Sequence, residues 1–241
     1  MLIGPQIWAA NLAAVRERIA AAARRAGRDP ATVTLVGVSK AQPAAAVAAL
    51  HAAGLTDFGE NYLQEALLKQ AAVPRADTVW HFIGQLQANK SRAVAEHFDW
   101  VHTIDRLRIA ERLAAQRPFH GPDLNVCVQV KLADEAAKGG VAPQELPALA
   151  RAVAALPRLK LRGLMCVPPP AAEESTQRGW FAQLRGLRDR LNAERVGGAG
   201  TLDVLSMGMS ADFEAAILEG ATHVRVGTAL FGERLPAAAP G

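Results

Sequence analysis

The sequence has little of what several classes of protein require. Cysteine occurs only twice in 241 residues, as Cys127 and Cys166, and both lie in apolar runs. We therefore expect buried, reduced thiols rather than a disulfide or a metal pair. Aromatic residues make up only 5% of the chain, and no basic block carries interleaved aromatics, which argues against a nucleic-acid surface. No uncharged apolar run is long enough for a membrane span.

The N-terminus also lacks the apolar segment of a secretory signal. Arg16, Glu17 and Arg18 interrupt the apolar pattern early in the chain. The net charge of +4 is mild for this length and gives no indication of a polyanionic partner. These absences together predict a soluble, cytoplasmic protein that binds neither nucleic acid nor membranes.

The apolar residues, half of the chain, are distributed in two alternating periodicities. Leu12, Val15, Ile19 and Ala22 have helical spacing, and Gly27 is a plausible end of this first helix. After it, short apolar runs alternate with helical stretches. The predicted strands are residues 33–38, 57–60, 79–83, 100–104, 124–130, 160–165, 202–206 and 223–226. The predicted helices between them are residues 43–53, 62–72, 86–97, 105–117, 143–156, 173–195 and 210–219.

This alternation indicates the fold class. Strands separated by helices pair in parallel through right-handed crossovers. Eight such units predict an α/β fold, a single (β/α)8 TIM-type barrel with an extra N-terminal helix, as one domain over residues 1–241. The alternative is an open doubly wound sheet. Such a sheet usually has a Gly-rich dinucleotide turn after its first strand, and VGVSKAQP at residues 36–43 has none.

In such barrels, function gathers where the strands end. Side-chain alternation directs Lys40, His81 and Arg225 toward the barrel interior or its mouth. An inward histidine is more often a hydrogen-bonded core residue than a ligand, and that alternative applies to both His81 and His223. A lysine and an arginine together indicate a site for an anionic ligand. Desolvation and a neighbouring cation both make a lysine amine a better nucleophile.

Two small-residue loops follow the last two predicted strands. They read SMGMS at residues 206–210 and RVGTALFG at residues 225–232. This is where such barrels often hold a phosphate on backbone N–H groups, although tight turns are the alternative explanation. A nucleophilic lysine beside a phosphate site suggests Schiff-base formation with a phosphorylated aldehyde. Pyridoxal 5'-phosphate fits that description.

Longer motifs carry a family resemblance. VGVSK, DFGENYLQE, WHFIGQLQANK, GLM and SMGMSADFEAAILEGATHVRVGTALFG resemble the pyridoxal phosphate homeostasis protein family, from the first helix to Phe231. The resemblance implies the barrel of the alanine racemase N-terminal domain without that enzyme's second β-domain. It implies these cofactor-binding residues: Lys40 as the Schiff-base lysine, Ser206, Gly227 and Thr228 at the phosphate, Arg225 at the pyridine nitrogen, and Asn61 and His81 around the pocket.

The chain departs from the family pattern at a few positions. Gln85 stands where a histidine or proline is frequent, Ala41 stands where a threonine is frequent, and CVPPP at residues 166–170 is unusual. These departures concern the pocket rim. Further matches to the family have either a direct role or an ordinary solvated position: Lys131, Lys138, Gln87, Asn89 and Lys90.

Three functions compete. The first is a non-catalytic carrier or buffer of pyridoxal phosphate that serves apo-enzymes, and the second is a one-domain amino-acid racemase. The third is a barrel enzyme in which Lys40 forms a Schiff base with a sugar phosphate. Arg225 favours the carrier, because an arginine leaves the pyridine nitrogen unprotonated and the ring a weak electron sink. We therefore predict a carrier, as a monomer rather than a dimer.

Overall fold

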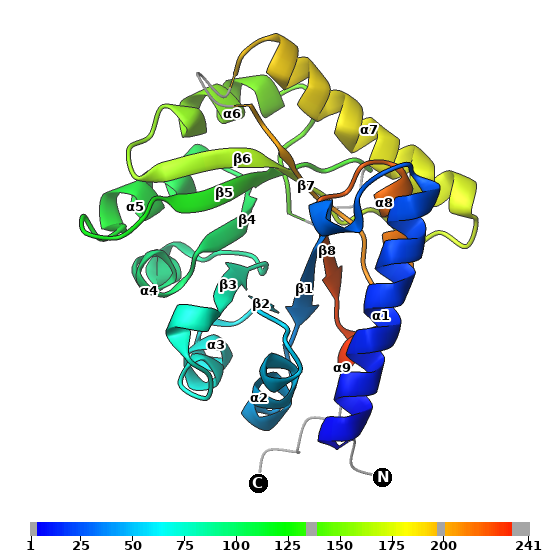
Figure 1. The fold of residues 1–241 in the computed structure, drawn as a ribbon. Coiled ribbons are helices and arrows are strands. Elements are labelled where there is room, and N and C mark those ends of the chain that lie inside the picture. The colour runs from blue at the N-terminus through cyan, green and yellow to red at the C-terminus, as the bar shows by residue number, and fades with distance from the viewer. Residues whose placement is uncertain (1–3, 134–138, 197–200, 233–241) are drawn as a thin grey trace, which may run out of the picture.

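The structure, a computed structural model, describes residues 4–133, 139–196 and 201–232. The strands of this part close into a barrel in which sequence neighbours pair in parallel and β8 pairs with β1 (Figure 1). This confirms the predicted (β/α)8 architecture. The strands are β1 (Thr34–Val38), β2 (Asp57–Glu60), β3 (Val79–Phe82), β4 (Trp100–Ile104), β5 (Leu124–Gln129), β6 (Leu159–Met165), β7 (Val204–Ser206) and β8 (His223–Val226).

The helices surround the barrel and follow the predicted order. They are α1 (Pro5–Arg25), α2 (Ala44–Ala52), α3 (Leu63–Gln70), α4 (Ser91–His97), α5 (Leu107–Gln116), α6 (Leu146–Ala154), α7 (Glu174–Ala193), α8 (Phe213–Leu218) and α9 (Thr228–Phe231). Residues 88–90, near the start of the predicted helix 86–97, form a 3-10 turn before α4. The short helix α9 is an addition to the predicted elements, because four residues are too few to show a helical period.

The N-terminal helix α1 is the predicted addition to the barrel, and it packs along α8, α9 and α2 (Figure 1). Its buried face consists of Trp8, Leu12, Val15, Ile19, Ala22 and Ala23. The Nδ2 of Asn11 donates to the Leu230 carbonyl at 2.9 Å, and Arg18 lies 2.6 Å from the Glu214 carboxylate. These contacts hold the first helix against the loops and helices that follow the last two strands.

Apolar residues fill two layers. Between strands and helices, Trp80 stacks on Phe58 with ring centroids 5.5 Å apart, and Phe82 meets Phe98 at 5.4 Å. The barrel interior has a different composition, because three histidine rings share it with a small apolar cluster. These interior residues are His81, His102, His223, Trp100, Cys127, Met165 and Val204.

Both cysteines are buried and free, as predicted, and burial raises the pKa of each thiol to about 12. Neither is therefore a thiolate at neutral pH. None of the described helices combines the length and apolarity of a membrane-spanning segment.

Candidate functional site

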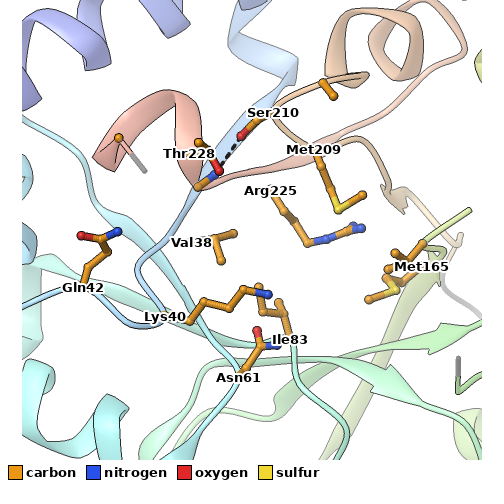
Figure 2. A pocket seen from close by; sticks show the side chains of 14 residues that line it. Val38, Lys40, Gln42, Asn61, Ile83, Met165, Met209, Ser210, Arg225 and Thr228 are labelled. Atoms are coloured by element: carbon orange, nitrogen blue, oxygen red, sulfur yellow. Dashed lines mark hydrogen bonds between the residues drawn. The ribbon is translucent and has the colours of Figure 1, made fainter. Parts of the chain in front are cut away.

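A pocket of about 380 Å³ opens at the end of the barrel where the strands terminate (Figure 2). One wall is apolar and consists of Val38, Ile83, Met165 and Val167. The polar lining comes from Lys40, Gln42, Asn61, Ser210, Arg225 and Thr228. Figure 2 shows the side chains of Lys40, Asn61 and Arg225 pointing into one space. The volume and mixed lining are typical of a small-molecule site.

Lys40 lies in a tight turn directly after β1. The backbone N–H of Gln42 donates to the Ser39 carbonyl at 3.0 Å. Ala41 has a φ of 58°, in the left-handed region that disfavours residues with a Cβ. Lys40, two residues beyond the last residue of β1, thereby lines the pocket.

A buried ionic cluster supports this turn from below. Lys69, on α3, is 3% exposed, and its Nζ donates to the Ser39 carbonyl at 2.6 Å and to Glu60 Oε1 at 2.7 Å. Its Nζ also lies 3.2 Å from Glu65 Oε2, which accepts the Ala41 N–H at 2.9 Å. Both the start and the middle of the turn are thus tied to one ammonium group. Lys69 is not among the residues expected from the sequence, although its helical spacing from Leu63 and Ala66 puts it on the buried face of α3.

Two buried side-chain oxygens at this side of the pocket have no partner within the described residues. They are Glu60 Oε2 and Asn61 Oδ1. Burial raises the pKa of Glu60, while the hydrogen bonds from Lys69 and Ser39 oppose that shift. Asn61 lines the pocket, and its buried acceptor lacks a partner within the described residues, as is uncommon for a buried polar atom.

The opposite side of the pocket is built from the loops after β7 and β8. Ser210 Oγ accepts the N–H of Gly227 at 3.2 Å and that of Ala229 at 3.4 Å. With two N–H groups donating to this oxygen, the Ser210 hydroxyl proton can be donated to an anion. Thr228 lies beside it, as Figure 2 shows. A Cβ on Gly227 would lie 3.3 Å from the Val38 carbonyl, so glycine allows this loop to approach β1 closely.

The β7 loop has a fixed shape. Gly208 has a φ of 92°, and the Arg225 N–H donates to its carbonyl at 3.0 Å. Asp212 Oδ1 accepts the Met209 N–H at 2.6 Å. Burial raises the pKa of Asp212, against the opposing effect of that hydrogen bond. These contacts hold Ser210 in place without help from a ligand.

Arg225 lies at the floor of the pocket and is 4% exposed. Its Nη1 donates to Ser206 Oγ at 2.7 Å, and its Nη2 donates to the Cys166 carbonyl at 2.9 Å. Burial lowers the pKa of the guanidinium, but arginine remains the cation least prone to lose its proton. The unusual segment at 166–170 therefore meets the site through a backbone carbonyl and through Val167.

Two of the expected residues do not line the pocket. Ser206 is fully buried at the end of β7, where its Oγ contacts Arg225 and His102. Ser210, in the same motif, lines the pocket together with Gly227. His81 is also fully buried and hydrogen-bonded inside the barrel, in agreement with its core-residue alternative. Lys40, Asn61, Arg225, Gly227 and Thr228 do line the pocket.

The remaining described positions singled out in the sequence, both matches to the family and departures from it, lie outside the pocket lining. Gln85, Gln87 and Lys90 line a neighbouring hollow of about 390 Å³ that shares Asn61 with the pocket. Lys131 does not line either hollow, and Lys138 lies outside the described residues. Tyr62 is 60% exposed and borders the neighbouring hollow rather than the pocket.

The alanine racemase N-terminal domain family matches residues 10–235. A pyridoxal phosphate homeostasis protein of Pseudomonas aeruginosa is 60% identical over 226 residues, covering 94% of this chain and 95% of that protein. The chain therefore belongs to the alanine racemase N-terminal domain family, and within it to the pyridoxal phosphate homeostasis proteins. The pyridoxal phosphate homeostasis protein of Escherichia coli is 51% identical over 231 residues, covering 93% of this chain and 95% of its own length.

One similar protein of known structure contains a bound ligand. PipY of Synechococcus elongatus, determined with pyridoxal phosphate bound, superposes with a TM-score of 0.81 at 39% identity. The match covers 93% of this chain and 100% of PipY. Enzymes such as a D-threonine aldolase, at 15% identity and a TM-score of 0.74, share the fold alone.

Proposed function

We propose that this protein binds pyridoxal 5'-phosphate and carries or buffers it for vitamin B6 homeostasis, without substantial catalysis of its own. The observation that supports this most strongly is one pocket with Lys40, Arg225 and the Ser210–Gly227–Thr228 loops along its walls. A 39% identical relative has pyridoxal phosphate bound on the same fold.

The residues present fit each part of the cofactor. When bound, pyridoxal phosphate supplies an aldehyde that condenses with a lysine amine, and Lys40 is the only lysine among the described residues that line the pocket. Arg225 would face the ring nitrogen, and the unpaired Asn61 Oδ1 offers an acceptor to the ring hydroxyl. Ser210, Gly227 and Thr228 would hold the phosphate.

Two features support a carrier over an enzyme. Arg225 has only donors, so a ring nitrogen that faces it stays unprotonated. An unprotonated ring is a weak electron sink and stabilises a carbanion poorly. Racemisation also requires a second base on the other face of the substrate. Two candidates for this second base among the described residues lie outside the pocket lining: Tyr62 borders the neighbouring hollow, and His81 lies inside the barrel.

The test of binding is the visible absorbance spectrum of purified protein, before and after borohydride reduction, followed by peptide mapping. We expect a covalent adduct on Lys40. Lys40→Ala should abolish that adduct and leave the fold intact, as measured by circular dichroism. A fully stoichiometric adduct on another lysine in Lys40→Ala protein, with Lys90 and Lys131 examined first, would contradict the assignment.

The one-domain racemase remains the alternative, and a chiral assay separates it from the carrier. Alanine and several other amino acids are incubated with loaded wild-type protein, with Lys40→Ala protein as the control. We expect turnover below about 1 s⁻¹, the low end of ordinary enzyme rates. Faster turnover that depends on Lys40 would favour the racemase.

We also propose that residues 1–241 form one domain, since every described strand belongs to the one closed sheet. Delivery to apo-enzymes, a cytoplasmic location and a monomeric state stay predictions. Transfer assays with an apo-enzyme, cell fractionation and light scattering test them in turn.

A further inference from the structure

A line of buried polar side chains runs through the barrel interior below the pocket. Arg225 Nη1 lies 2.7 Å from Ser206 Oγ, which lies 2.7 Å from His102 Nδ1. His102 Nε2 is 2.9 Å from His81 Nδ1, and His81 Nε2 is 3.0 Å from Asp57 Oδ1. The line crosses from β8 through β7, β4 and β3 to the start of β2. There, Asp57 borders a hollow that is lined from α1, β1 and the segments before β1 and β2.

Counting protons along this line gives it one direction. Arginine has only donors, so Ser206 Oγ accepts from Arg225, and its own proton needs another acceptor. His102 Nδ1 is that acceptor, which puts the His102 proton on Nε2. His81 Nδ1 then accepts from His102, so the His81 proton is on Nε2 and is donated to Asp57. Every bond is satisfied only when both rings are neutral Nε2–H tautomers.

The surroundings favour this arrangement. Burial lowers the pKa of His102 well below its ordinary value, and the nearby guanidinium of Arg225 adds to that shift. Burial is the largest single influence on the pKa of Asp57 and raises it, but the hydrogen bonds from His81 and Thr56 and the neighbouring histidines together lower that pKa below its ordinary value. The ring centroid of the third interior histidine, His223, lies 6.0 Å from the centroids of both other rings. His223 Nδ1 forms a hydrogen bond with Thr222 Oγ1 instead.

We propose that His102 and His81, with Asp57 as the terminal acceptor, are positioning residues that orient Arg225 toward the ring nitrogen of the ligand. This rests on the proposed function, in which Arg225 faces that nitrogen. The guanidinium is held at two corners, by Ser206 Oγ and by the Cys166 carbonyl. The Ser206 corner keeps its geometry only while His102 accepts the serine proton. The remaining N–H groups of Arg225 are thereby presented to the pocket at a fixed angle.

The first test requires no ligand. Histidine ¹⁵N chemical shifts of the wild-type protein near pH 7.5 distinguish the two tautomers and the protonated ring. The signals are assigned with His102→Asn, His81→Asn and His223→Asn variants. We expect Nε2–H tautomers for both His102 and His81. An Nδ1–H tautomer or an imidazolium at either position would overturn the proposal.

The second test isolates the ring nitrogen. Dissociation constants are measured for pyridoxal phosphate and for its analogue with a CH group in place of the ring nitrogen. We expect wild-type protein to prefer pyridoxal phosphate about tenfold or more, the usual size of a charge-assisted hydrogen bond. His102→Phe should reduce that preference to about threefold or less. His102→Asn keeps an acceptor toward Ser206 and should restore most of it.

His223→Asn is the matched control, because it alters an interior histidine outside the line, and we expect its preference to equal that of wild type. If His102→Phe fails to fold, Asp57→Ala at the less buried end of the line is the second variant, and it should also reduce the preference for pyridoxal phosphate.

Equal weakening of both ligands by His102→Phe would indicate a merely structural role and would overturn the proposal. Wild-type protein that binds neither ligand would overturn the proposed function, while the tautomers still test the hydrogen-bond direction separately.

Discussion

The two sides of the pocket are built by different means. On the side of β1 and β2, the Lys40 turn is held by a buried ammonium that contacts two carboxylates and a backbone carbonyl. On the side of β7 and β8, the Ser210 hydroxyl and the Asp212 carboxylate accept backbone N–H groups and hold the loops in shape. The amine side therefore depends on charges that folding must bury, whereas the loop side depends on backbone shape. Substitutions on the first should chiefly change stability, and substitutions on the second should chiefly change affinity.

The largest expected effect is on the amine side. Lys69→Met leaves Glu60 buried without its cation, and removing one partner of a buried pair typically costs about 3–5 kcal/mol of unfolding free energy. Adding Glu60→Gln should recover part of this loss, because no uncompensated charge then remains. Urea unfolding followed by circular dichroism measures both. Lys160→Met, at an exposed lysine of β6, is the control and should stay within about 0.5 kcal/mol of wild type. A loss for Lys69→Met as small as the control's would refute the contrast.

The next effect is on the loop side. Ser210→Ala and Thr228→Val each remove a hydroxyl donor, and a lost hydrogen bond to a charged group costs about 1.5–3 kcal/mol, or roughly 10- to 150-fold in affinity. We expect this loss for pyridoxal phosphate and almost none for unphosphorylated pyridoxal, as measured by fluorescence titration.

Ser206→Ala provides the comparison for these variants. Because Ser206 contacts Arg225 rather than the loop, its removal should weaken both ligands to the same degree. A loss confined to the phosphorylated ligand in Ser206→Ala would return Ser206 to the phosphate site.

A third effect concerns the barrel interior beneath both sides. Burial lowers the pKa of His223 to about 3 and that of His102 well below 6.5. Above pH 6.5 both the folded and unfolded states hold these rings neutral, so stability is full. As the pH falls from 6.5 toward 3, the unfolded state takes up protons that the folded state resists. Each histidine then removes about 1.4 kcal/mol per pH unit.

Urea unfolding between pH 7 and pH 4.5 measures this slope. His223→Asn should reduce it by about one histidine's share, 1.4 kcal/mol per pH unit. His120→Asn, at an exposed position, should leave it unchanged. Equal slopes for wild type and His223→Asn would show that the ring is not held neutral.

The smallest effect tests the backbone of the Lys40 turn. Ala41→Gly removes a Cβ from a residue with a φ of 58°, which relieves about 1 kcal/mol of strain but adds freedom to the unfolded chain. We expect a net change below about 1 kcal/mol, in the stabilising direction. Ala21→Gly, at an exposed position within α1, should instead destabilise by about 1 kcal/mol. Destabilisation of similar size in both variants would mean that the turn tolerates its alanine without strain.

The barrel was predictable because its strands and helices alternate along the whole chain, and Lys40 and Arg225 were predictable because each ends or nearly ends an apolar strand. The sequence did not show which of the two serines of SMGMS lines the pocket. Ser206 is the last residue of β7 and faces the barrel interior, whereas Ser210 lies four residues later in the loop. Residue type and motif are the same for both, and the predicted strand also ends at Ser206, so only the contacts that Ser206 makes with Arg225 and His102 inside the barrel distinguish them.

Interactions across the barrel were beyond sequence patterns for a related reason. Lys69 and Glu60 come from different elements, and His102 meets Ser206 at a separation of 104 residues. Alternation indicates that a side chain points inward, but the neighbours it meets depend on strand register and barrel closure. The histidine line therefore appeared only with the three-dimensional structure.

The two cysteines have a consequence for the selectivity of the pocket toward electrophiles. Thiols compete with amines for aldehydes, and the reactive form is the thiolate. With pKa values of about 12 and no solvent exposure, Cys127 and Cys166 present almost no thiolate at neutral pH. Alkylating reagents should leave both unmodified in the folded protein. The Lys40 amine that lines the pocket therefore has no competition from a cysteine thiolate for an aldehyde that enters it.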